Sequence, residues 1–164
     1  MLDFETSEMA QALAPAAHRL VDEARNDDAL DADDWFDLGV ELEAVSIEQA
    51  IAAYRSSLRL EPDNADTHVN LGRLLQESGL LDEAERAYLS ALRHDDTHTT
   101  AVFNLGTVLE DQQRVTEALD AYRRAIELDP DFVDAHFNLA RLYEQSGDRD
   151  AALRHLRSYR ALTL

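Results

Sequence analysis

The side chains best suited to chemistry are three asparagines and two arginines that recur along the chain. Asn70, Asn104 and Asn138 are spaced 34 residues apart, in the segments "HVNLGRLL", "VFNLGTVL" and "HFNLARLY". A primary amide both donates and accepts hydrogen bonds, so such a row can bind the backbone of a peptide without selecting its sequence. Arg73 and Arg141 each follow an asparagine by three residues and could form a forked pair with a carboxylate. This chemistry is that of recognition.

A second group, "HDDTH" at 94–98, places two histidines and two aspartates within five residues. It could bind a divalent metal, but it falls in a turn, where a solvated loop is the more frequent arrangement. His68 and His136 occupy equivalent positions, and we expect them to pack at helix contacts. The chain has no cysteine, which excludes thiolate ligands, thiolate nucleophiles and disulfides. No catalytic constellation stands out, so we expect no metal, no cofactor and no enzymatic activity.

The chain is strongly acidic, with 15 basic residues, all arginine, against 34 acidic ones and a net charge of −19. Such a charge repels phosphate backbones, so we expect no direct binding to nucleic acid and a basic or neutral protein or peptide partner. No apolar run approaches the roughly 20 residues of a membrane span. The start, "MLDFETSEMAQ", carries acids where a secretory signal carries basic residues. We therefore expect a cytoplasmic protein, and the exclusive use of arginine suggests a GC-rich bacterial source.

The residues around the asparagines repeat with the same spacing. These residues form the structural elements that position the asparagines. Each unit repeats a small residue, then an alanine, then a bulky residue: Gly72, Gly106 and Ala140; Ala84, Ala118 and Ala152; Tyr88, Tyr122 and Leu156. A further unit begins upstream at "WFDLGVEL", where Gly39 precedes Gly72 by only 33 residues. We interpret this as the loss of one residue from the internal turn of the first unit. A fixed period of this length indicates a helical repeat array.

The repeated unit resembles the tetratricopeptide repeat, a helix–turn–helix of 34 residues. The first unit carries its signature at Trp35, Leu38, Gly39, Leu42, Ala50, Tyr54 and Pro62. The resemblance implies an all-α, right-handed superhelical solenoid of four units, preceded by a partly helical N-terminal segment at 1–31. The expected array spans 32–164, with units at about 32–64, 65–98, 99–132 and 133–164. Its helices are expected at about 33–44, 46–60, 65–78, 81–93, 99–112, 115–128, 133–146 and 149–161.

The residue types have physical reasons in such an array. Gly72 and Ala84 are small because the two helices of a unit cross closely there, and Tyr88 is expected to fill the space beyond the crossing. Gly79 and Gly147 are suited to the left-handed conformation that ends a helix. Each unit can bury its apolar face only against its neighbours, so the stack should form a continuous core and a concave side.

The resemblance also implies a site, because the first helices of tetratricopeptide repeats line a groove that binds peptides. Carried onto this sequence, the groove residues are Phe36, Val69, Asn70, Arg73, Phe103, Asn104, Thr107, Phe137, Asn138 and Arg141. Acids such as Glu110 and Glu144 leave this groove net negative. Each asparagine could equally be scaffold, and the phenylalanines could partly pack between first helices. The family's carboxylate clamp is not expected, because the chain has no lysine.

The two ends leave alternatives open. Residues 5–26 predict a helix that begins or bends near Pro15, either capping the first unit or forming a free arm. Tyr159 stands where Ser57, Ala91 and Ala125 are small, so it could form the edge of a homodimer or lie over its own repeat.

A second resemblance concerns the entry to the array. "LDF" at 2–4 and "DADDWFDLGVELE" at 31–43 are similar to bacterial regulators in which a MerR-type DNA-binding head precedes tetratricopeptide repeats. The chain contains no such head. Two functions follow: a protein interaction scaffold that binds a segment of another protein in its groove, or the interaction module of a MerR-like regulator.

Overall fold

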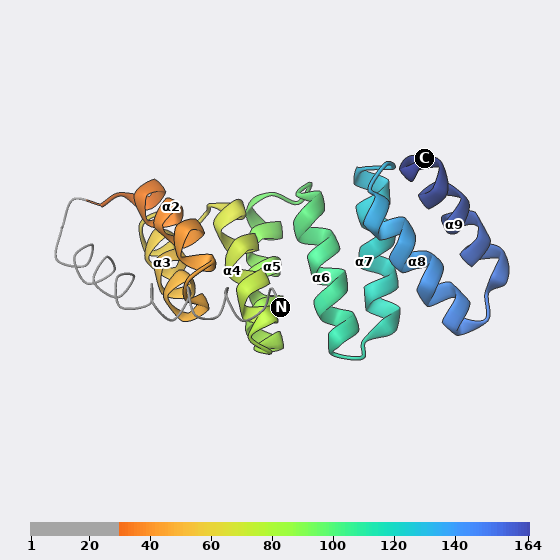
Figure 1. Cartoon of the computed structure of the whole chain (residues 1–164), viewed down its shortest axis with the longest axis horizontal. Coiled ribbons are helices and arrows are strands. Elements are labelled where there is room, and N and C mark those ends of the chain that lie inside the picture. Colours follow the sequence, from red (N-terminus) through yellow and green to blue (C-terminus); the bar gives the residue numbers. More distant parts are fainter. Residues whose placement is uncertain (1–29) are drawn as a thin grey trace, which may run out of the picture.

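The computed structural model describes residues 30–164, which contain eight α-helices and no strand (Figure 1). The helices are α2 (Ala32–Glu43), α3 (Ile47–Leu60), α4 (Ala65–Glu77), α5 (Leu81–His94), α6 (Thr99–Asp111), α7 (Val115–Leu128), α8 (Val133–Ser146) and α9 (Arg149–Thr163). Every predicted helix is present, and every predicted boundary lies within two residues of the observed one. The helix predicted within 5–26 lies outside the described residues.

The helices form four antiparallel pairs that stack in chain order as an all-α solenoid (Figure 1). Each unit packs its first helix against its second, and the second helix then packs against the first helix of the next unit. The first helices α4 and α6 also contact one another. We call the surface formed by α2, α4, α6 and α8 the first-helix face. None of these eight helices is long and apolar enough to cross a membrane.

The helix starts are fixed mainly by side-chain caps. Asp31 accepts the backbone N–H of Asp34, and the Asp34 carboxylate accepts the N–H of Asp31, which forms a capping box at the start of α2. Asn64 caps α4 in the same position of the next unit. These caps set where each first helix begins, and thereby which of its side chains face outward.

The repeated glycine and tyrosine are in direct contact. A Cβ built on Gly39, Gly72 or Gly106 would lie 2.6 Å from a ring carbon of Tyr54, Tyr88 or Tyr122 respectively. The three tyrosines are completely buried. The prediction that Tyr88 fills the space beyond the helix crossing is therefore wrong in its placement, because each ring lies on the glycine itself. A glycine is needed there since no other residue leaves room for the ring.

The internal turns differ at one backbone position. Gly79 and Gly147 adopt φ values of 75° and 85°, which confirms the prediction that they end their helices in the left-handed region. The third unit has Gln113 at the same place, with φ 64°. No residue of the first unit's turn, 44–46, has a positive φ. The first unit therefore turns without a left-handed residue, and its α2 is one residue shorter than α4 and α6, whereas its turn has the same length.

Candidate interaction face

The ten predicted groove residues all lie on first helices, but they differ in exposure. Phe137 is the most open of the three predicted phenylalanines, with 47% of its surface exposed. Val69 is only 7% exposed and belongs to the apolar core. Its prediction as a ligand contact does not agree with this burial. The remaining eight are half-buried: Phe36, Asn70, Arg73, Phe103, Asn104, Thr107, Asn138 and Arg141.

The phenylalanines contribute to the scaffold as well as to the surface. Phe36 lies 5.6 Å from Tyr54 between ring centroids. Phe103 is held more tightly, 5.4 Å from the ring of Tyr122 and 5.0 Å from that of Phe132. These tilted aromatic contacts are favourable, so the two side chains have a packing role in the absence of any ligand.

Polar side chains join each unit to the next across the first-helix face. Arg73 of α4 pairs with Glu43 of α2. Arg141 of α8 donates to both oxygens of the Glu110 carboxylate, at 2.6 and 2.7 Å. At the junction between these two, the Gln76 amide donates to the Thr107 hydroxyl at 3.2 Å and to the Asp111 carboxylate at 2.6 Å. We call these three contacts the junction pairs: Glu43–Arg73, Gln76–Thr107 and Glu110–Arg141.

The hydroxyl groups of the buried tyrosines donate to one member of each junction pair. The hydroxyl of Tyr54 donates to Glu43 at 2.6 Å, and that of Tyr122 donates to Glu110 at 3.2 Å. Burial raises the pKa of both tyrosines, and the adjacent carboxylates raise it further. The hydroxyls therefore remain protonated donors. The Tyr88 hydroxyl donates in the same way to the side-chain amide oxygen (Oε1) of Gln76, at 3.1 Å.

Two of the predicted asparagines lie beside these hydroxyls. The Asn70 side chain acts against the rise in the pKa of Tyr54, and the Asn138 side chain acts in the same way on the pKa of Tyr122. Within α6 the backbone carbonyl of Asn104 accepts the Thr107 hydroxyl at 2.8 Å, a contact that does not involve the Asn104 amide. Asn70 and Asn138 therefore contribute to the scaffold, and all three repeated asparagines are half-exposed.

Sequence reasoning placed Glu110 in the groove but missed the contacts between units that form this network. Glu43, Gln76 and Glu110 each stand four residues after the unit's glycine. Each meets the residue that follows the repeated small residue of the next unit, which is Gly72, Gly106 or Ala140. A signal existed in the sequence, since an arginine follows a glutamate by 30 or 31 residues at two of the three junctions. Only the stacking of the units shows that this spacing brings them into contact.

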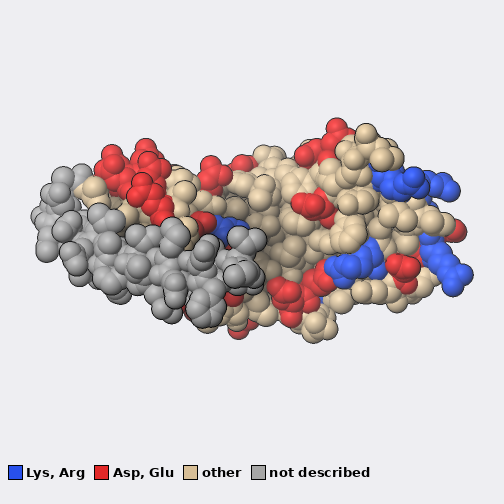
Figure 2. Space-filling view, viewed as in Figure 1, with Lys and Arg blue, Asp and Glu red and all other residues tan. Residues whose placement is uncertain are grey.

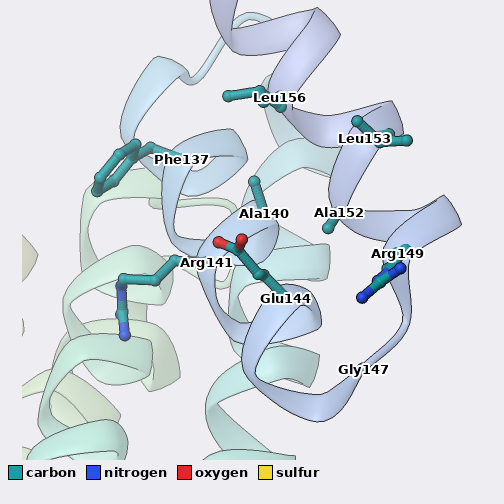
Figure 3. Close-up of a pocket in the computed structure, with 9 residues that line it drawn as sticks. All are labelled: Phe137, Ala140, Arg141, Glu144, Gly147, Arg149, Ala152, Leu153 and Leu156. Atoms are coloured by element: carbon teal, nitrogen blue, oxygen red, sulfur yellow. The ribbon is translucent and has the colours of Figure 1, made fainter.

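The fourth unit contains an open pocket of about 640 Å³ between α8 and α9, which we call the fourth-unit pocket (Figure 3). Two predicted groove residues, Phe137 and Arg141, line it. Figure 3 shows Leu153 and Leu156 of α9 facing α8 across the pocket. The complete lining is Phe137, Ala140, Arg141, Glu144, Gly147, Arg149, Ala152, Leu153 and Leu156.

Charge is distributed unevenly over the array. Figure 2 shows acidic side chains over α2 and arginines near the C-terminal end, where α9 carries Arg149, Arg154, Arg157 and Arg160. A ligand bound near α8 and α9 would therefore meet both signs of charge, in contrast to the net charge of the whole chain.

The histidines have structural contacts. His98 caps α6, because its Nδ1 accepts the N–H of Ala101 at 3.2 Å while its Nε2 contacts Asp66 at 3.0 Å. His68 and His136 contact the carbonyl oxygens of Pro62 and Pro130 at 2.9 and 2.8 Å, which confirms their packing role. Within residues 30–164, no group of three or more histidine, aspartate or glutamate side chains could hold a metal ion.

The comparisons with known proteins agree with this architecture. The family model described as tetratricopeptide repeat matches residues 69–132 and 103–163, and a second one, described as TPR repeat, matches 46–79. No curated protein sequence matches the chain significantly.

Among solved structures, a crystal structure of MamA has a TM-score of 0.79 at 19% identity, covering 97% of this chain and 91% of that one. MamA 41-end from Desulfovibrio magneticus RS-1 has a TM-score of 0.78 at 17% identity, with 96% and 93% covered. MamA AMB-1 has a TM-score of 0.73 at 24% identity, with 96% and 97% covered. At these identities the likeness concerns the fold alone.

The matched family models and these structures do not relate the chain to MerR-type regulators, so that resemblance is not supported. The match at 69–132 and 103–163 covers more than half of the chain, and the four stacked helix pairs have the architecture that it describes. The chain belongs to the tetratricopeptide repeat family.

Proposed function

We propose that this protein is a non-enzymatic interaction scaffold that binds a segment of another protein along its first-helix face. Tetratricopeptide repeat proteins are in general protein-interaction scaffolds. The observation that carries the proposal is the fourth-unit pocket, where Phe137 and Arg141 line an open cavity of about 640 Å³ at the end of the first-helix face. The half-exposed amides of the three repeated asparagines extend this surface towards α4.

The ligand surface that remains after the junction pairs are formed has a definite chemistry. Arg73 and Arg141 already bind carboxylates within the array, so they have less capacity to bind a ligand's carboxylate. Amides and an aromatic side chain remain available, which suits the backbone and apolar side chains of a peptide. We therefore expect a partner that is neutral or basic and that contributes at least one large apolar side chain.

The proposal can be tested by affinity capture from the lysate of the source cell with a pair of matched variants. Phe137→Ala combined with Asn104→Ala removes surface from the first-helix face, and we expect it to lose the captured partner while the helical circular dichroism signal is kept. Leu89→Ala is the control, because Leu89 is 44% exposed and lies on the second helix α5. Capture that persists in the double variant would show that the partner binds elsewhere.

A further inference from the structure

The fourth unit lacks a feature that the other three share. In units one to three a tyrosine ring fills the space between the two helices of the unit, and its hydroxyl donates to a glutamate or glutamine of the first helix. In the fourth unit Leu156 stands in place of the tyrosine and Ala140 in place of the glycine. The fourth-unit pocket lies between these two residues.

An aromatic ring is present nearby, but it lies one helical turn further along α9. Tyr159 contacts Phe137 at 5.5 Å between ring centroids, as Phe36 and Phe103 contact the tyrosines of their own units. Tyr159 therefore lies over its own repeat, which is one of the two arrangements predicted for it. Because the aromatic ring of the fourth unit is attached three residues later on α9, no ring covers Ala140.

The acceptor that belongs to the missing tyrosine is still in place. Glu144 occupies the position of Glu43 and Glu110, which receive a tyrosine hydroxyl and an arginine of the next unit. Within residues 30–164 the exposed Glu144 side chain forms no hydrogen bond or ion pair. It lines the pocket on the α8 side, near Ala140 (Figure 3).

The second helix of the fourth unit also differs from that of the third unit at the position that packs on the following helix. Ala125 is fully buried in a cluster with Ala135 of α8, so the next first helix packs directly on a small side chain. Tyr159 stands at the position of Ala125, and its ring lies against Phe137 of α8 in its own unit. A helix that packed on α9 in the register of the array would therefore meet a large side chain where α8 meets a small one.

We infer that the fourth-unit pocket binds a tyrosine side chain of the partner protein. The ring lies against Leu153 and Leu156, and its hydroxyl donates to the Glu144 carboxylate, as internal hydroxyls do at Glu43 and Glu110. Tyrosine suits the site because it joins a large apolar body to one polar tip. Since Ala140 carries a Cβ, the ring lies further from α8 than the internal rings do, on the open side of the pocket.

This inference rests on the proposed function, because Phe137 and Arg141 belong to both surfaces. It is tested with the full chain and a display library of random 12-residue peptides. We expect peptides selected on the wild type to converge on tyrosine, and replacement of that tyrosine by phenylalanine to raise the Kd, measured by fluorescence anisotropy, about tenfold or more, as expected for a lost hydrogen bond to a charged group.

Two variants at Glu144 distinguish a ligand that donates a hydroxyl group from a ligand that brings a positive charge. Glu144→Leu removes the acceptor, and we expect it to raise the Kd as much as the change of tyrosine to phenylalanine does. Glu144→Gln keeps an acceptor, and Gln76 already accepts the hydroxyl of Tyr88, so the Kd should change less than about threefold. An arginine ligand would be lost equally in both variants, and that result would overturn the inference.

A third variant fills the pocket from within. Ala140→Gly with Leu156→Tyr recreates the arrangement of Gly106 and Tyr122, and we expect it to fold normally and to lose the selected peptides. The inference is overturned if the library yields no tyrosine-containing family or if the selected peptides bind the filled variant as tightly as the wild type. Failure of the proposed function is a separate result, since it is read from cellular capture by Phe137→Ala with Asn104→Ala.

Discussion

Gly106 and Tyr122 fit together so closely that a single methyl group on the glycine would lie 2.6 Å from Cε1 of the ring. The same relationship joins Gly72 to Tyr88 and Gly39 to Tyr54, whereas the fourth unit has changed both partners, to Ala140 and Leu156. The glycine and the tyrosine thus behave as one structural element that is kept or replaced as a whole.

Gly106→Ala should therefore destabilise the protein, against the ordinary preference of a helix for alanine. Propensity alone favours alanine by about 1 kcal/mol, whereas forcing an atom into a packed core costs about 1–3 kcal/mol or more. We expect a net loss of about 1–2 kcal/mol, measured by urea unfolding. Adding Tyr122→Leu should recover part of the loss, as the pair Ala140 and Leu156 indicates. Two independent, additive effects would contradict this coupling.

Replacing Gln113 should make the protein more stable. It adopts φ 64°, where Gly79 and Gly147 stand in the equivalent turns, and a side chain in the left-handed region costs about 1–2 kcal/mol. Gln113→Gly should raise the free energy of unfolding by about 1 kcal/mol, seen as a higher urea midpoint. The reverse change, Gly79→Gln, should lower it by a similar amount. A destabilised Gln113→Gly would show that the backbone there is unstrained.

The junction pair Glu110–Arg141 should contribute through charge. Both side chains are partly exposed, so we expect Arg141→Met to cost only about 1 kcal/mol, as for other partly solvated ion pairs. A double-mutant cycle with Glu110→Gln measures the coupling, which should weaken in 1 M NaCl because salt screens exposed charges. The coupling of Gly106 to Tyr122, which is steric, provides the control that salt should leave unchanged.

The lowered pKa of His155 leads us to expect that the protein loses stability on mild acidification. Burial, helped by His136, Arg154 and Arg123, lowers the pKa of His155 below its ordinary value of 6.5. The unfolded chain then binds a proton at a higher pH than the folded one, so the free energy of unfolding falls as the pH drops through 6.5 towards the folded pKa. His68 acts in the same direction, because burial lowers its pKa too.

The variant that isolates this effect is His155→Ala, because alanines occupy the same position at 87 and 121. Urea unfolding of the wild type and of the variant between pH 7.5 and 5 should show a flatter pH dependence in the variant, whatever its absolute stability. A variant that keeps the wild-type slope would mean that His155 titrates alike in the folded and unfolded chains.

The fold could be predicted because each unit repeats local information. The spacing, together with the resemblance to the tetratricopeptide repeat, predicted the helices to within two residues, and Gly79 and Gly147 predicted the left-handed turns. The left-handed Gln113 could not be predicted, since only its place in the repeat, and not its residue type, favours that conformation.

The candidate site was less predictable because it depends on contacts between units. The resemblance to the family places Val69 in the groove, but the packing of the repeats buries its side chain. Arg73 was expected to meet a ligand's carboxylate, whereas the neighbouring unit supplies one from Glu43. The repeat pattern places the predicted residues on first helices, and the packing of successive units decides which of their side chains remain free.

The most direct test of the account is hydroxyl-radical footprinting of the captured complex. Phe137 and Leu89 are similarly exposed, at 47% and 44%, but lie on a first and a second helix respectively, so each reports on a different face. If a protein segment binds along the first-helix face, the oxidation of Phe137 should fall in the complex while that of Leu89 stays unchanged. Protection of Leu89 with an unprotected Phe137 would contradict the account.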